Sequence, residues 1–357
     1  MRHVYFLVII GLLLSCKKDE PVEPTANCTN GIQDGDETGI DCGGSCPSCF
    51  TPAEPFEGYE LFTSSDEIDC FDVYPGFDAH IVVATSNALG QSLQLSTDGG
   101  ANWTTITSPS ATDIKDFKFP WSDQLFALDL NGNIYKSTTE GASWSQLFPG
   151  ESLNSISMIG IRDTLLGLSN YRLYLSTDAG GTWNQVFNGS TIGGRTLEIA
   201  ERIAGDDIIM TTRDVATANY FVHTSNDHGL TWSEVSSISG SNILDFHFED
   251  SQTGYAVGPF TGILKTLDQG ATWTIHENTF SNGVHVYIND TTGVAISNNP
   301  YFTINSGSSF EQLLYNDGTP QYFSYRVNAT GQPVKSFYNS VYVNKTNSIT
   351  VYPLSNL

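Results

Sequence analysis

An eight-residue pattern recurs six times along the chain, and this repeat limits the choice of fold more than any other feature. The first copy, STDGGANW, covers residues 96–103, and the six copies start 41, 39, 49, 41 and 37 residues apart. A period near 40 residues with several short strands per unit predicts a β-propeller rather than a helical solenoid. The patterned positions are Ser96, Asp98, Gly100, Trp103, Ser137, Gly141, Trp144, Ser176, Asp178, Gly180, Trp183, Ser225, Asp227, Gly229, Trp232, Thr266, Asp268, Gly270, Trp273, Asn305, Gly307 and Phe310.

The segments between these octets are typical of short β-strands. They are rich in β-branched and aromatic residues and are separated by Gly, Asn, Asp and Ser. Residues 196–204 are the best helix candidate, and they also fit an inner strand. We interpret the short turn within 341–352 as a degenerate seventh octet. The sequence thus predicts an all-β protein with a seven-bladed propeller over 55–357, with six or eight blades as alternatives. Residues 58–65 are expected to add an edge strand that closes the ring.

The chemistry of the octet favours a structural role. Its Asp side chain can accept hydrogen bonds from backbone amides of its own turn, and its Gly can adopt a positive φ. The Trp offers a large apolar face that we expect to pack beneath the hairpin of its own blade. The octets resemble the Asp-box, or BNR, repeat of sialidases and sortilin-type receptors. That resemblance places each octet in the turn between the third and fourth strands of a blade.

The N-terminus predicts export and a lipid anchor. A short basic start precedes an apolar run over residues 4–15, which is too short to span a bilayer and suits a secretory signal. The run ends in LLSC, which resembles the lipobox of bacterial lipoproteins and implies cleavage of a signal peptide, residues 1–15, and lipidation of Cys16. The KKDE that follows resembles the surface-export signal of Bacteroidetes-type lipoproteins. We therefore expect an outer-membrane lipoprotein that faces the cell exterior.

Residues 16–54 are expected to contain the anchor, a linker and a small Cys-rich module. The module resembles a motif found after the anchor of many bacterial surface lipoproteins, and we interpret it as a stalk. In an exported chain its four cysteines suggest two disulfides of undetermined connectivity; they are Cys28, Cys42, Cys46 and Cys49. Zinc bound by the four thiolates is one alternative. Calcium bound by Asp34, Asp36 and Asp41 is another, and no other cofactor is expected.

The charge of the chain excludes one class of partner. With 39 acidic and 15 basic residues, the formal net charge is −24, and such a surface repels nucleic acid. The resemblance to sialidases also raises the question of catalysis. Those enzymes bind the substrate carboxylate with three arginines, one of which precedes the first Asp-box. In this chain no arginine lies between Arg2 and Arg162. Sialidase activity is therefore not expected.

Strand alternation predicts where a partner binds. The octets share one end of the propeller with the first-to-second turns, so the second-to-third turns and the links between blades lie at the other end. Loops from all blades converge there, around the mouth of the central channel. The candidate contacts at that end are Tyr171, Arg172, Arg213, Tyr220, Asn299, Tyr301 and Tyr338. We expect a non-enzymatic surface lipoprotein that binds a protein or a glycan; a surface glycoside hydrolase is the alternative.

Overall fold

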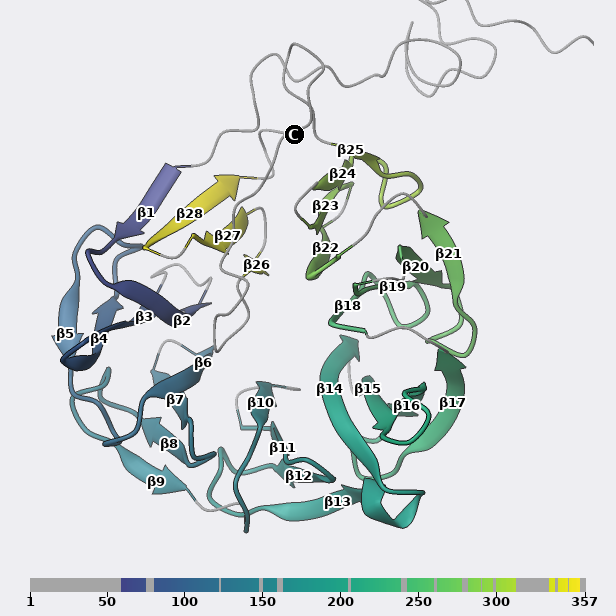
Figure 1. The fold of residues 1–357 in the computed structure, drawn as a ribbon, viewed down its shortest axis with the longest axis horizontal. Coiled ribbons are helices and arrows are strands. Elements are labelled where there is room, and N and C mark those ends of the chain that lie inside the picture. Colours follow the sequence, from purple (N-terminus) through teal and green to yellow (C-terminus); the bar gives the residue numbers. More distant parts are fainter. Residues whose placement is uncertain are drawn as a thin grey trace, which may run out of the picture. The chain divides into compact units, whose positions relative to one another are not determined.

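The computed structural model describes residues 59–74, 80–121, 123–147, 150–158, 163–204, 207–238, 243–259, 262–277, 282–289, 291–297, 300–312, 334–337, 340–345 and 347–353. Residues 1–53 and 54–357 form separate units, and the described residues all belong to the second. Within this second unit, seven four-stranded antiparallel sheets follow one another around a ring (Figure 1). The predicted all-β, seven-bladed propeller is confirmed.

The first four blades follow the chain order, each from its innermost to its outermost strand. Blade 1 contains β2 (Glu67–Tyr74), β3 (His80–Asn87), β4 (Gly90–Ser96) and β5 (Thr104–Ile106). Blade 2 contains β6 (Ile114–Trp121), β7 (Gln124–Asp129), β8 (Ile134–Ser137) and β9 (Ser145–Leu147). Blade 3 contains β10 (Ser155–Met158), β11 (Leu165–Leu168), β12 (Arg172–Ser176) and β13 (Asn184–Asn188). After a short 3-10 helix, η1 (Gly189–Thr191), blade 4 contains β14 (Arg195–Ala204), β15 (Asp207–Asp214), β16 (Tyr220–Ser225) and β17 (Ser233–Ile238).

The last three blades include the closure of the ring. Blade 5 contains β18 (Asp245–Phe248), β19 (Gly254–Val257), β20 (Ile263–Thr266) and β21 (Thr274–Glu277). Blade 6 contains β22 (His285–Asn289), β23 (Thr292–Ile296), β24 (Tyr301–Thr303) and β25 (Glu311–Gln312). Blade 7 combines β26 (Val334–Phe337), β27 (Ser340–Asn344) and β28 (Ser348–Pro353) with β1 (Tyr59–Thr63).

The predicted closing strand is confirmed as β1, which pairs antiparallel with β28 as the outermost strand of blade 7 (Figure 1). Residues 196–204, the best helix candidate, belong to the inner strand β14. The interpretation of the last turn is wrong. The connection between β27 and β28 joins the second and third strands of blade 7, so it does not stand at the position of an octet.

The core lies between neighbouring blades. One cluster joins Val82 of blade 1 to Phe117 of blade 2, and another joins Leu166 of blade 3 to Met210 of blade 4. Ile349 of blade 7 packs with Ile68 and Phe71 of blade 1. Each sheet therefore buries both of its faces, since alternate side chains of a strand point to opposite neighbours. Among the described residues, no helix is long and apolar enough to cross a membrane.

Candidate functional site: the face of the interblade links

Chain order assigns every connection to one of two ends of the propeller. We call the end with the octets and the first-to-second turns the octet face. The opposite end, with the second-to-third turns and the links between blades, is the link face. The octets of blades 1 to 6 join third to fourth strands, as in blade 1, where residues 97–103 join β4 to β5.

The octet Asp is bound within its own turn. Asp98 Oδ1 accepts the Ser96 hydroxyl and the Asn102 amide, each at 2.8 Å, and Asp98 Oδ2 accepts the Asn102 side chain at 2.7 Å. These bonds, led by the one from the Asn102 side chain, lower the pKa of Asp98. Asn305 of blade 6 accepts the Ser309 amide in the same way, at 3.0 Å. The octet acid is thus engaged in its own turn, in agreement with the sequence interpretation.

Two successive residues of each octet turn have a positive φ, and the sequence predicted only the second. The glycine at that second position has φ values from 65° at Gly307 to 91° at Gly100. The residue before it is also left-handed, although it is not glycine in five of the six octets, where it is Glu140, Ala179, His228, Gln269 or Ser306. No sequence signal could have indicated this, because these residues do not favour positive φ.

The octet aromatic packs in its own blade, as the sequence predicts, and also against the preceding blade. Within its own octet, the Trp103 indole donates to the Gly100 carbonyl at 3.0 Å, and Trp273 contacts Phe246 of its own inner strand, β18. Trp103 lies edge-on to Phe62 of β1, with ring centroids 4.6 Å apart, and Trp232 contacts Phe187 of β13. The Trp144 indole donates to the Thr107 carbonyl, next to β5, at 2.8 Å. The side chain therefore fills the interface between two blades, and this interface exists only in the folded ring.

The predicted contact residues differ in their exposure to solvent. Tyr171 is 39% exposed in the second-to-third turn of blade 3, and Arg172 begins β12 beside it. Arg213 is half-buried near the end of β15. Tyr220 and Tyr301 are buried, at 5% and 9% exposed, so the prediction that they are surface contacts is wrong.

The two remaining contact residues, Asn299 and Tyr338, lie outside the described residues. For Tyr338 the assigned turn is also wrong, since the connection between β26 and β27 is a first-to-second turn and belongs to the octet face. Cys16, Cys28, Cys42, Cys46, Cys49, Asp34, Asp36 and Asp41 lie outside the described residues too, so lipidation, disulfides and calcium stay predictions. In the described part of the chain, no group of three or more His, Cys, Asp or Glu could hold a metal ion.

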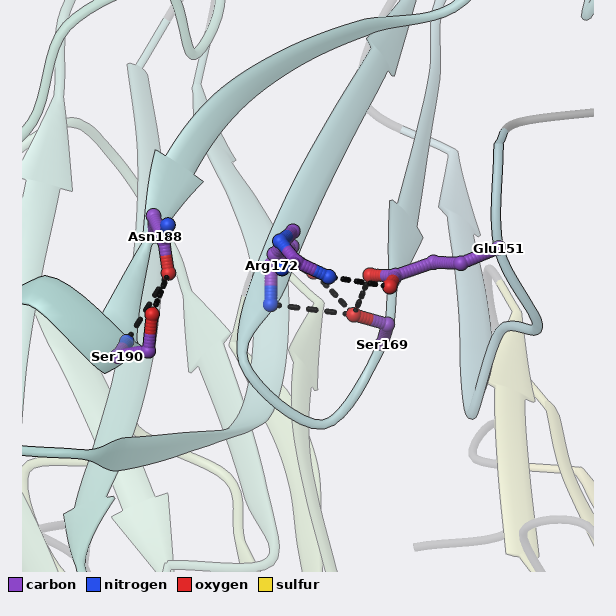
Figure 2. A network of polar contacts seen from close by, with 5 residues as sticks. All are labelled: Glu151, Ser169, Arg172, Asn188 and Ser190. Carbon is purple, nitrogen blue, oxygen red and sulfur yellow. Dashed lines mark hydrogen bonds and ion pairs between the residues drawn. The ribbon is translucent and has the colours of Figure 1, made fainter.

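An ion pair connects two loops of the link face at blade 3 (Figure 2). Glu151, in the link that leads to β10, accepts Arg172 Nη1 at Oε2, 2.5 Å away, and the Ser169 hydroxyl at Oε1. Ser169 Oγ in turn accepts the Arg172 backbone amide at 3.1 Å. The link and the second-to-third turn are therefore fixed to each other. Sequence reasoning proposed Arg172 but missed Glu151, which is 21 positions away in the chain.

A second arginine, Arg195, was also missed as a partner in an ion pair. Its Nη1 lies 2.5 Å from Glu234 Oε2, and its Cζ lies 3.4 Å above the ring of Phe221. Arg172 and Arg195 thus bind to different carboxylates within the protein.

Charged side chains also gather on the innermost strands. Lys118 Nζ of β6 lies 3.4 Å from Asp116 Oδ2, and Asp72 Oδ2 of β2 accepts the Phe119 amide at 2.8 Å. Burial acts to lower the pKa of Lys118, but the charges of Asp116, Asp72 and Glu201 outweigh it, and this pKa is raised. Lys118 thus stays cationic and offsets part of this acidic charge.

Two buried histidines, His223 of blade 4 and His247 of blade 5, are neutral near pH 7. Burial lowers the pKa of His223 to about 4, and its Nε2 lies 2.9 Å from the Thr212 hydroxyl. Burial also lowers the pKa of His247 to about 4. His285 Nδ1 lies 2.9 Å from Asp245 Oδ2, which also accepts the Val286 amide at 3.0 Å. The Asp245 contacts join the inner strands of blades 5 and 6.

Comparison with known proteins supports the fold. Residues 77–191 match the family described as the DUF6242 beta propeller domain. No curated protein matches the chain in sequence. Among solved structures, YCF48 bound to a D1 peptide is 14% identical, with a TM-score of 0.59, over 83% of this chain and 96% of that one.

Two further structures resemble the chain over part of their own length. PorZ, an essential surface component of the type-IX secretion system of Porphyromonas gingivalis, is 12% identical with a TM-score of 0.58, over 84% of this chain and 38% of that one. The GH74 xyloglucanase from Xanthomonas campestris is 12% identical with a TM-score of 0.59, over 84% of this chain and 54% of that one. At these identities the similarity shows the propeller fold alone.

Proposed function

We propose that this chain is a non-enzymatic surface lipoprotein of the outer membrane whose Asp-box propeller binds a protein partner through its link face. The proposal rests on one observation, that charged side chains near that face are paired with each other. Glu151 is bonded to Arg172 and Ser169, and Arg195 is bonded to Glu234. Such paired groups build a rigid recognition surface, whereas hydrolysis of a glycoside needs two carboxylic groups poised around the bond.

A protein is favoured over a glycan by the aromatic side chains at this face. Of the three predicted tyrosines in described positions, Tyr171 is exposed while Tyr220 and Tyr301 are buried. A single exposed ring is a small platform for sugar stacking. The structure of YCF48 with a D1 peptide supports peptide binding as one use of a propeller of this kind.

The same proposal includes the predictions for the N-terminal segment. Cys16 carries the lipid, the four cysteines of the stalk form two disulfides, and calcium at Asp34, Asp36 and Asp41 is the alternative role for the acidic loop. Replacing Cys16 by Ser is expected to release the protein from the membrane fraction, because one polypeptide without acyl chains lacks the anchor. Retention of the variant in the membrane would refute the anchor.

Photo-crosslinking in the cells that produce the protein tests the binding face. A benzophenone amino acid is placed at Asn131 or Ala216, both exposed on the link face, and at Thr177 or Ser143, both exposed on the octet face. We expect one and the same protein to be crosslinked from the two link-face positions only. Crosslinks from the octet face alone, or turnover in a parallel panel of chromogenic glycosides, would overturn the proposal.

A further inference from the structure

A large apolar side chain is exposed in each second-to-third turn of four consecutive blades. These are Leu89 of blade 1, Leu130 of blade 2, Tyr171 of blade 3 and Val215 of blade 4, which are 98%, 50%, 39% and 58% exposed. All four belong to the link face, since each follows the second strand of its blade. Isolated exposed apolar residues are common, but one at the same topological position in four adjacent blades forms an ordered set. We call these four residues the apolar arc.

Hydrogen bonds hold the turns that present the arc. The Leu89 amide donates to Asn87 Oδ1 at 2.8 Å, and the Leu130 amide donates to the Asp113 carbonyl at 2.9 Å. The Tyr171 carbonyl accepts the Gly189 amide from the following link at 2.7 Å. Beside Val215, Asp214 Oδ1 accepts the amides of Ala216 and Thr217 at 2.8 and 3.0 Å. The side chains are thus exposed on fixed turns, which reduces the ordering cost of binding.

The charges around the arc indicate the chemistry of what covers it. The chain has a formal net charge of −24, and two arginines beside the arc are paired with acids. Arg172 lies next to Tyr171 and binds Glu151, and Arg195 binds Glu234. An acidic segment would have to compete for these arginines and would also meet the repulsion of the whole molecule. An uncharged, apolar segment complements this face without either cost.

We infer, resting on the protein-binding role proposed above, that the partner presents an extended, uncharged, apolar polypeptide segment that lies along the apolar arc. One extended chain can contact successive blades in turn. The apolar surface that it buries is the source of the affinity. Because ion pairs contribute little, the affinity depends only weakly on salt.

Selection from a phage-displayed library of random 12-residue peptides tests this inference on the full chain. The arc variant combines Leu89→Ser, Leu130→Ser, Tyr171→Ser and Val215→Ser. The control variant combines Leu230→Ser, Leu267→Ser and Ile304→Ser, which change equally exposed apolar residues of the octets, at 59%, 67% and 39%. Both variants are compared with the parent protein by thermal unfolding, to establish that they fold.

We expect selected peptides to be apolar and uncharged, and synthetic copies to bind the arc variant at least tenfold more weakly than the parent or the control. Their Kd should change less than twofold between 50 and 500 mM NaCl. Charged peptides with a steep salt dependence, no selected peptide, or equal loss in both variants would overturn the inference. Binding of the parent, but not the arc variant, to neutral phosphatidylcholine vesicles without peptide selection would assign the arc to a membrane and overturn it too. If the crosslinked partner still binds the arc variant, the inference fails while the proposed link-face function stands.

Discussion

Asp227 accepts three hydrogen bonds inside its own octet, from the Ser225 hydroxyl and from the amide and hydroxyl of Thr231, at 2.6 to 2.8 Å. These bonds, with the one from the Thr231 hydroxyl as the largest cause, lower the pKa of Asp227 to about 2. A neutral substitute serves at Asn305, which makes the same contact to the amide four residues later. The residue thus acts as a turn acceptor, and its charge adds a dependence on pH.

This dependence can be measured. The pKa of Asp227 is depressed on folding, so its contribution to stability is complete above the unfolded value of about 4 and is lost as pH falls from there to about 2. We expect the free energy of unfolding of the parent protein to fall more steeply between pH 5 and pH 3 than that of Asp227→Asn, measured by urea titration. Asn305→Asp should add a similar slope to the parent. Equal slopes in the three proteins would contradict this account.

At the scale of elements, the octet glycine allows its turn to approach the preceding blade. A Cβ on Gly180 would lie 2.4 Å from Leu147 Cδ1 of β9, and one on Gly141 would lie 2.5 Å from Ile106 Cδ1 of β5. The same octets contribute their aromatic side chains to the interfaces between blades described above. Glycine is therefore required both by its positive φ and by the space between blades.

Substitution of Gly180 separates these two requirements. We expect Gly180→Ala to lower the free energy of unfolding by about 2–4 kcal/mol, from the left-handed φ of 86° and from overpacking against Leu147. Gly194→Ala is the control, because its φ of 73° is also left-handed but nothing lies within 4 Å of its Cβ, so it should cost about 1 kcal/mol. Adding Leu147→Ala to Gly180→Ala should recover part of the loss. If both glycine variants lose equal stability in chemical denaturation, the interface between blades does not limit this position.

At the scale of the whole propeller, the first strand of the described chain completes the last blade. β1 pairs with β28, and its Leu61 and Phe62 pack beside Trp103 and Ile68 of blade 1. Asn344 of blade 7 also donates to the Ile68 carbonyl at 3.1 Å. Closure thus depends on segments from opposite ends of the sequence.

Two truncations test the closure. Removal of residues 1–63 deletes β1, whereas removal of residues 1–58 leaves it in place. We expect the shorter protein to unfold at a lower temperature by calorimetry and to self-associate in size-exclusion chromatography, because β28 would become an unpaired edge. The longer protein should stay monodisperse. Identical melting temperatures for the two truncations would show that β1 does not close the ring.

Local chemistry determined much of this protein in advance. The octet period indicated the blades, and the octet acid and glycine indicated their turn. The segment 58–65, which precedes the first blade, indicated the strand that closes the ring. The turn chemistry of the octet depends on backbone geometry within a few residues, and so can be read from neighbouring positions. The last blade was harder, because it has no octet, and its turns were therefore assigned to the wrong faces.

The tertiary structure alone decided which side chains meet across blades. The pairing of Arg172 with Glu151 and the packing of Trp103 against Phe62 of the preceding blade both join residues from separate segments, and Tyr220 and Tyr301 are buried by the packed ring. The apolar arc has the same origin, since Leu89 and Val215 are distant in sequence and share a face only because the strands alternate in direction around the ring. The repeat specified the blade, and packing between blades specified the surface that a partner meets.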